Sequence, residues 1–181
     1  MTRDEALKLV QAKVKTKNLV KHMLAVEAGM RALAPRFGED PERWALAGLI
    51  HDLDYEETKE SPHVHGTITV NQLRERGLSD EEVLGAILAH AGRKEAETPI
   101  ERALTAVDPL TGLIVAAALV HPKRLAGLTP HNVLNRYREK GFARSASRDG
   151  IASCRGLGLE LEEFVTIILA AMQGIRDELG L

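Results

Sequence analysis

The sequence predicts an all-α protein, a single-domain helical bundle of 181 residues. Ser, Thr or Asp followed directly by Pro, a pair typical of helix starts, recurs along the chain. Apolar residues also repeat at helical spacing, as in the stripe Leu19, Met23, Val26, Met30 and Leu33. No alternating run of β-branched residues is bounded by hairpin turns, so we expect no strands.

The first half of the chain contains five predicted helices. Capping boxes and Pro-containing starts mark four of them: Thr2/Glu5, Asp40-Pro41, Ser61-Pro62 and Ser79/Glu82. The Leu19 stripe defines the remaining one, the second in chain order. These signals place helices over residues 3–15, 17–35, 41–53, 62–76 and 80–91.

The second half follows the same logic. Helix starts are indicated by Thr98-Pro99, where Glu101 completes a capping box, by Asp108-Pro109 and by Thr129-Pro130. Leu161, Val165, Ile168 and Met172 form the inner stripe of the last helix. The expected helices cover residues 99–107, 109–120, 130–139, 144–155 and 160–179.

Composition excludes several classes of protein. Aromatic residues make up only 3% of the chain, which argues against a base-stacking platform for single-stranded nucleic acid. The net charge of -2 argues against a groove for polyanions. Cys154 is the only cysteine, so no internal disulfide forms. With no secretory signal and no membrane-length apolar run, we expect a soluble cytoplasmic protein that binds neither a membrane nor a nucleic-acid polymer.

Polar residues stand where the helical pattern predicts core. His22 shares a face with Leu19 and Val26, His51-Asp52 ends a long apolar run, and His90 follows Val83 and Ile87. A lone histidine on such a face is usually a satisfied core residue, and Asp108 before Pro109 also fits a helix cap. Because a buried carboxylate is costly unless paired or metal-bound, the set together indicates one shared site. Its nitrogen and oxygen donors suit a divalent metal.

The stretch from Ala47 to Tyr55, AGLIHDLDY, resembles the signature of the HD-domain metal-dependent phosphohydrolases. The segment after Asp108 is similar to the helix that carries the last Asp of that superfamily. The resemblance covers about residues 19–120 and implies an HD-type helical domain over 1–181, with a C-terminal extension over 121–181. It implies four metal ligands: His22, His51, Asp52 and Asp108.

Some members of the superfamily bind a second metal through two further histidines. His65 and His90 stand in the corresponding places here, and His63 is a weaker candidate. The resemblance therefore implies one or two divalent ions, with Mn, Fe, Co, Ni, Zn and Mg all open. His65 and His90 contacting substrate phosphate or water is the alternative.

The chain departs from two groups of the superfamily. It has no Gly-Tyr-Pro motif of the cyclic-dinucleotide phosphodiesterases. It has Tyr55 where the nucleotidases and alarmone hydrolases place an acidic residue. We expect Asp52, Asp54 and Glu56 to act in catalysis, the last two as base or orienter, although a solvated acidic loop also explains the segment that follows Asp52.

A phosphate ester also needs cationic contacts. The basic residues that follow the predicted ligands along the chain are the candidates, each of which could instead be an ordinary exposed charge: Arg93, Lys94, Lys123, Arg124, Lys140, Arg144 and Arg148. The last three lie on one face if their segment is helical.

We therefore expect a metal-dependent phosphohydrolase that cleaves a phosphate ester by metal-activated water. Its partner is a small phosphorylated substrate, with a nucleotide as one option, and a homo-oligomer stays open. Two alternatives remain: a di-iron oxygenase on the same scaffold, and a non-catalytic regulator that binds metal or nucleotide.

Overall fold

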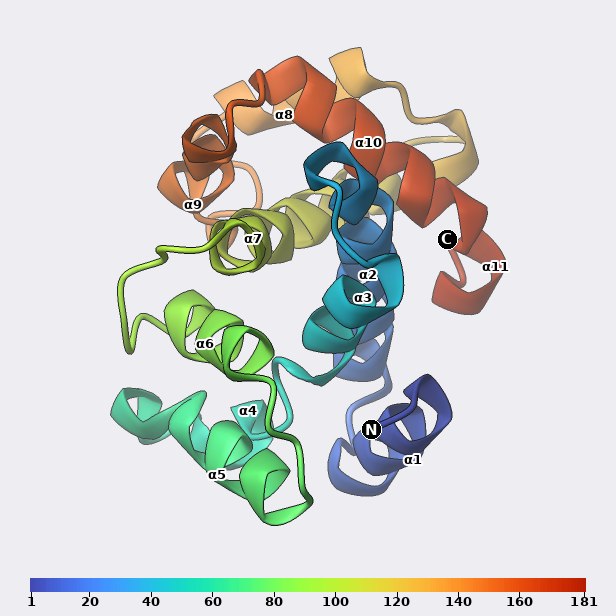
Figure 1. The fold of residues 1–181 in the computed structure, drawn as a ribbon. Helices are drawn as coiled ribbons and strands as arrows, with labels where there is room; N and C mark the ends of the chain where they lie inside the picture. The colour runs from blue at the N-terminus through green and yellow to red at the C-terminus, as the bar shows by residue number, and fades with distance from the viewer.

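The computed structural model describes residues 1–181 and confirms a single-domain, all-α fold without strands (Figure 1). Four short 3-10 helices lie at Ala34–Phe37 (η1), Pro62–Val64 (η2), Leu125–Gly127 (η3) and Ser153–Leu157 (η4). The α-helices are α1 (Arg3–Lys13), α2 (Lys17–Leu33), α3 (Pro41–Ile50), α4 (Tyr55–Thr58), α5 (Thr67–Glu75), α6 (Glu81–His90), α7 (Pro99–Val120), α8 (Pro130–Arg138), α9 (Arg148–Ala152), α10 (Leu161–Gly174) and α11 (Arg176–Leu179).

Helices α2 and α7 form the centre of the bundle. Helix α2 packs most extensively against α3, while α7 contacts α6 on one side and α2, α9 and α10 on the others. In Figure 1 the C-terminal helices α8 to α10 arch over the top of α7, and α4 to α6 lie below it. One apolar core joins both halves, because residues from α1 to α11 belong to the same buried cluster.

Helix α7 corrects the sequence prediction at Asp108-Pro109. The two predicted helices, 99–107 and 109–120, are one continuous helix with Pro109 inside it. Proline removes one backbone hydrogen bond and usually breaks a helix. Here Val107 and Leu110 on either side are fully buried, so packing against the core holds the helix together across the proline.

Length and mean hydropathy alone would allow α7 to cross a membrane, contrary to the expectation that no segment is long enough. The helix is also the central element of the core, and 56% of its most apolar window is buried inside the fold. Core helices of soluble proteins pass the same test, so this helix is weak evidence for a membrane span.

Local caps explain where several helices begin. The predicted capping box Thr2/Glu5 is present in full. At Thr98/Glu101 the Glu101 carboxylate accepts from the Thr98 amide at 3.1 Å, while the Thr98 hydroxyl has no hydrogen-bond partner. The predicted Ser79/Glu82 box is wrong, because Asp80 is the cap residue and accepts from the amides of Glu82 and Val83. An aspartate carboxylate next to the helix start offers a stronger acceptor than a serine hydroxyl.

The predicted helix 62–76 is divided at Gly66. This residue has a φ of 78°, and a Cβ at this position would meet the Ala91 Cβ at 2.7 Å and the Ile87 carbonyl oxygen at 3.1 Å. Only glycine fits the left-handed turn and the close approach to α6. The division leaves His65 outside both helices, between η2 and the N-cap Gly66 of α5. Its ring centroid lies 5.1 Å from that of His90, the last residue of α6.

Candidate metal centre

Asp52 lies at the middle of a ring of four histidines. Its Oδ2 atom is 3.4 Å from His51 Nε2 and 3.8 Å from His22 Nε2. Its Oδ1 atom is 3.4 Å from His65 Nε2 and 3.5 Å from His90 Nε2. The two carboxylate oxygens therefore face two different pairs of imidazoles, and every imidazole presents the same nitrogen.

Distant segments bring these residues together. His22 lies one turn and a half into α2, His51 caps the end of α3, and His90 is the last residue of α6. Asp108 comes from the middle of α7, where its Oδ1 lies 3.0 Å from His22 Nε2. Because α7 continues through Pro109, Asp108 lies within the helix and its side chain contacts His22 on α2, instead of capping a helix start.

Hydrogen bonds on the far side of the His51 and His90 rings fix how these two rings are oriented. His51 Nδ1 lies 2.8 Å from the carbonyl oxygen of Gly48, and His90 Nδ1 lies 2.5 Å from that of Ile87. A carbonyl only accepts, so each Nδ1 carries the proton and donates it. Their Nε2 atoms are then free to bind a cation, and both are buried without any hydrogen-bond partner.

His22 follows the same rule through a threonine. The Thr111 hydroxyl donates to the carbonyl oxygen of Asp108 at 2.9 Å, which leaves its oxygen to accept from His22 Nδ1 at 3.3 Å. Thr111 was missed by sequence reasoning. The signal was available, since Thr111 stands three residues after Asp108, in the first turn of the predicted helix that Asp108 precedes.

Asp54 orients the fourth histidine, His65. Its carboxylate is fully buried, with Oδ1 at 2.7 Å from His65 Nδ1 and Oδ2 accepting from the Thr69 amide at 3.0 Å. The Asp54 amide in turn donates to the Thr69 hydroxyl. Asp54 therefore contacts the Nδ1 side of the His65 ring and not the cleft. Of the two roles expected from the sequence, base or orienter, this position suits the orienter.

The charges of the cluster shift its pKa values strongly. Burial lowers the pKa of His51, but the neighbouring charge of Asp52 outweighs it and raises the pKa to about 9. His65 behaves in the same way, with Asp52 and Asp54 raising its pKa to about 9. Burial raises the pKa of Asp52, yet the charge of His51 holds it well below its usual range. The carboxylate is therefore ionised at neutral pH.

This arrangement fits a divalent cation. Two groups of three side chains have ligand atoms within 4.8 Å of one another: His22, His51 and Asp108, and His51, Asp52 and His90. A bound cation replaces the proton that the raised pKa values of His51 and His65 would otherwise keep on Nε2. Imidazole nitrogens and carboxylate oxygens are a donor set that first-row divalent metals prefer. The two buried, unpartnered Nε2 atoms are the strongest sign, because such groups are costly unless something binds them.

A cleft of about 620 Å³ opens above the cluster. His22, Asp52, His65, His90 and Asp108 all line it, whereas His51 lies beneath them. Its outer rim includes Asn18, Tyr55 and Ser145, which the sequence did not assign to the site. Tyr55 is 45% exposed.

The carboxylate of Glu56 forms its hydrogen bonds away from the cleft. Its carboxylate accepts hydrogen bonds from the backbone amides of Lys15 and Thr16, in the turn between α1 and α2. Hydrogen bonds from Thr16 and Lys15 lower the pKa of Glu56 to about 2. The expectation that Glu56 acts in catalysis is therefore replaced by a structural role, because its oxygens already hold this turn.

None of the predicted cationic residues lines the cleft. Arg93 donates to the carbonyl oxygens of Ala91 and His63, and Lys94 pairs with the buried Glu101 at 2.6 Å. His63 itself is exposed on η2. These contacts hold the loop after α6 in place.

The second basic cluster also differs from its prediction. Residues 139–147 are not helical, so Lys140, Arg144 and Arg148 do not share a helix face. Lys140 and Arg144 are exposed. Arg148 donates to six backbone carbonyl oxygens of segment 136–146 and is thereby committed to holding that loop.

Comparison with known proteins gives a family and distant relatives. The model of the HD domain matches residues 19–118. The chain is 27% identical over 136 residues to Ribonuclease Y of Thermotoga petrophila, and equally to those of Thermotoga sp. strain RQ2 and Thermotoga maritima. The match takes in 73% of this chain but only 27% of each relative, so the chain spans about a quarter of their length. No solved structure matches it.

The family match covers the segments that carry His22, His51, His65, His90 and Asp108. It confirms the resemblance seen in the sequence, and it agrees with an all-helical architecture around a His/Asp cluster. The chain therefore belongs to the HD domain family.

Proposed function

We propose that this chain is a phosphohydrolase that uses one or two divalent cations to cleave a phosphate ester of a nucleotide or another small phosphorylated metabolite. The convergence of four imidazole Nε2 atoms on the two oxygens of Asp52 carries the proposal. A carboxylate that faces two separate ligand pairs is suited to bridge two cations.

The two halves of the cluster have distinct ligand sets. His22, His51 and Asp108 would hold one cation together with Asp52 Oδ2. His65 and His90 would hold the other with Asp52 Oδ1. Divalent cations supply a bound water of lowered pKa and offset the negative charge of a phosphoryl group.

The protein contributes rigidity and shape. The carbonyl oxygens of Gly48 and Ile87, the Thr111 hydroxyl and the Asp54 carboxylate hold each ring with Nε2 toward the cleft. Such fixed orientation reduces the reorganisation needed when charge develops on the substrate. The open cleft of about 620 Å³ has room for a small phosphorylated molecule.

A second candidate substrate is the phosphodiester of an RNA. The supporting observation is the similarity to proteins named Ribonuclease Y over 136 residues. Against it stand the net charge of -2 and a cleft lined by no Lys or Arg. An extended polyanion gains most of its binding energy from phosphate contacts to basic side chains. A small substrate is therefore the better match.

Metal content and phosphate release together test this function. The protein loaded with Mn²⁺, Fe²⁺, Co²⁺, Ni²⁺, Zn²⁺ or Mg²⁺ is assayed against a panel of nucleoside monophosphates, sugar phosphates and short RNA oligonucleotides. Asp52→Ala should lose bound metal and turnover together, while the exposed Asp149→Ala on α9 should keep both.

Three outcomes would overturn the proposal. Full metal content and turnover in Asp52→Ala would remove Asp52 from the site. Oxygen-dependent turnover of the iron form, without phosphate release, would favour the oxygenase alternative. Metal-loaded protein that binds phosphorylated metabolites but hydrolyses none would favour a regulator.

A further inference from the structure

A second pocket, of about 300 Å³, opens beside the metal cleft. The two hollows share three residues, Asn18, His22 and Gly112. Gly112 lies on the exposed side of α7, and a Cβ added there would meet nothing within 4 Å. The boundary between the two pockets is therefore open at this point, and a ligand in the cleft can extend past His22 into the side pocket.

The side pocket carries the positive charge that the cleft lacks. Lys21 and Arg124 both line it, and no acidic residue does. Neither cation forms an ion pair or donates a side-chain hydrogen bond, in contrast to Arg93 and Lys94. Two uncompensated cations in one pocket favour an anion.

The remaining wall of the pocket is apolar. Val115 and Leu119 come from α7, Leu179 is the last residue of α11, and Leu181 follows that helix. Leu119 is 59% exposed, one of the few large apolar side chains on the surface. A wall of this kind beside two cations suits an anionic group attached to an organic body.

The backbone at Arg124 is held in an unusual conformation. Its φ is 47° and its ψ is -145°, a backbone conformation that residues other than glycine rarely adopt. Surrounding bonds keep it there, since the Arg124 amide donates to the His121 carbonyl oxygen and the Lys123 amide donates to His121 Nδ1. Strain of this kind often marks functional sites.

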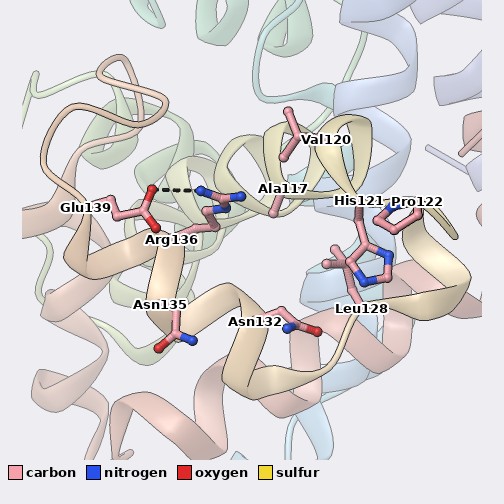
Figure 2. Close-up of a pocket in the computed structure, with 9 residues that line it drawn as sticks. All are labelled: Ala117, Val120, His121, Pro122, Leu128, Asn132, Asn135, Arg136 and Glu139. Carbon is pink, nitrogen blue, oxygen red and sulfur yellow. Dashed lines mark hydrogen bonds and ion pairs between the residues drawn. The ribbon is translucent and has the colours of Figure 1, made fainter.

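A third pocket contains an arginine whose charge is already neutralised by an ion pair. Figure 2 shows this hollow between the end of α7 and α8, with Arg136 and Glu139 on one side of it. Arg136 is paired with Glu139 at 2.8 Å, so its charge is compensated. The side pocket with Lys21 and Arg124 is therefore the better anion site.

From these contacts we propose that the side pocket binds a second anionic group of the substrate. The substrate is then a phosphate ester whose organic body carries another phosphate or carboxylate, such as a nucleoside bisphosphate. The scissile phosphoryl group lies in the metal cleft, while Lys21 and Arg124 hold the second anion. This inference rests on the proposed hydrolase function for the role of the cleft.

A binding measurement tests the pocket without any need for turnover. Metal-free, ¹⁵N-labelled protein in EDTA is titrated with phenyl phosphate, and amide chemical shifts are followed. We expect shifts around Gly112, Leu119 and Gly180 that saturate, and loss of this binding in Lys21→Gln and Arg124→Gln. Lys17→Gln, one turn earlier on α2, and Lys123→Gln, next to Arg124, are matched controls with exposed charges.

A kinetic measurement tests the link to the substrate. On the Mn²⁺-loaded protein, KM for adenosine 3′,5′-bisphosphate should rise about tenfold or more in Lys21→Gln and Arg124→Gln, because each loses a charge-assisted contact. KM for adenosine 5′-monophosphate, and kcat for both substrates, should stay unchanged. A rise of KM for the bisphosphate without a rise for the monophosphate distinguishes a lost anion contact from a general structural defect.

The outcomes are distinguishable. Binding that is equal in the wild type, the two pocket variants and the two controls would overturn the side pocket, whatever the turnover. Equal rises of KM for both nucleotides would also overturn it. Phosphate-ester hydrolysis missing altogether, with charge-dependent phenyl phosphate binding intact, would overturn the hydrolase function and leave an anion-binding pocket.

Discussion

The Oδ1 atom of Asp54 lies 2.7 Å from His65 Nδ1, in a position where the carboxylate has no exposure to solvent. Thr69 holds the other carboxylate oxygen through its amide. His65 comes from an irregular segment before α5, unlike His22 and His90, which are built on helices. Asp54 therefore supplies the rigidity that the backbone alone does not give to His65.

Asp54→Asn should weaken metal binding at the half of the cluster that contains His65. The amide can still accept from His65, but it then presents NH₂ to the Thr69 amide, so one of the two bonds is lost. Partners behind a metal ligand typically account for about 10–100-fold in metal affinity. Calorimetric titration with Mn²⁺ should show one weakened and one unchanged site. Unchanged affinity at both sites would remove Asp54 from its positioning role, and Asp149→Asn serves as the exposed control.

Much of the fold followed from local signals, and the exceptions have physical causes. Caps and apolar stripes gave the main helices, since both depend on residues close in sequence. The break at Gly66 and the continuity through Pro109 depend on contacts with α6 and with the core, which are distant in sequence. Local patterns cannot weigh the loss of one hydrogen bond at Pro109 against the burial of Val107 and Leu110.

Two helix glycines should respond oppositely to alanine. A Cβ at Gly112 in α7 would meet nothing within 4 Å, so Gly112→Ala should stabilise the protein by about 0.5–1 kcal/mol through helix propensity. A Cβ at Gly85 in α6 would collide with Glu101 Oε1, which is already held by Lys94. Gly85→Ala should therefore cost about 1–3 kcal/mol from overpacking. Urea unfolding measures both, and a stabilised Gly85→Ala would show that Glu101 can move freely.

Glu56→Gln should make the protein less stable above pH 4.5 but not at strongly acidic pH. The folded pKa of Glu56, about 2, lies below its ordinary value of 4.5. The ionised group thus contributes stability that is fully present above pH 4.5 and is lost as pH falls through about 2. The difference in urea midpoint between wild type and variant should narrow as the pH is lowered from 5 to 3.

Glu60→Gln provides the control, because Glu60 is exposed and has no partner in the fold. Its urea midpoint should follow that of the wild type at every pH. The hydrolase activity of Glu56→Gln at neutral pH should equal that of the wild type, since its carboxylate binds the turn at Lys15 and Thr16. A large fall in kcat without a loss of stability would restore Glu56 to the catalytic group.

The site was more predictable in its ligands than in its surroundings. Histidines on apolar faces are visible in sequence because they violate the hydrophobic pattern, as His22 and His90 do. The carbonyl oxygens of Gly48 and Ile87 that orient two rings leave no such trace, because every residue has a carbonyl. The sequence also does not show which basic side chains are free to bind a ligand. Lys21 has no partner in the fold, whereas Arg148 donates to backbone carbonyl oxygens, and both are simply positive charges in the sequence.

Arg148→Lys should destabilise the loop between α8 and α9. The guanidinium donates to six carbonyl oxygens, among them those of Phe142 at 2.6 Å and Ala146 at 2.8 Å. A lysine has three donors at a single point and cannot reach all of them. The expected cost is about 1–3 kcal/mol, with faster amide hydrogen exchange over residues 139–147. Arg144→Lys, at an exposed position in the same loop, should change neither quantity. A different result would contradict this assignment. If Arg148→Lys raised KM for phosphate esters and left stability and hydrogen exchange unchanged, the guanidinium would contact the substrate and not the loop carbonyl oxygens.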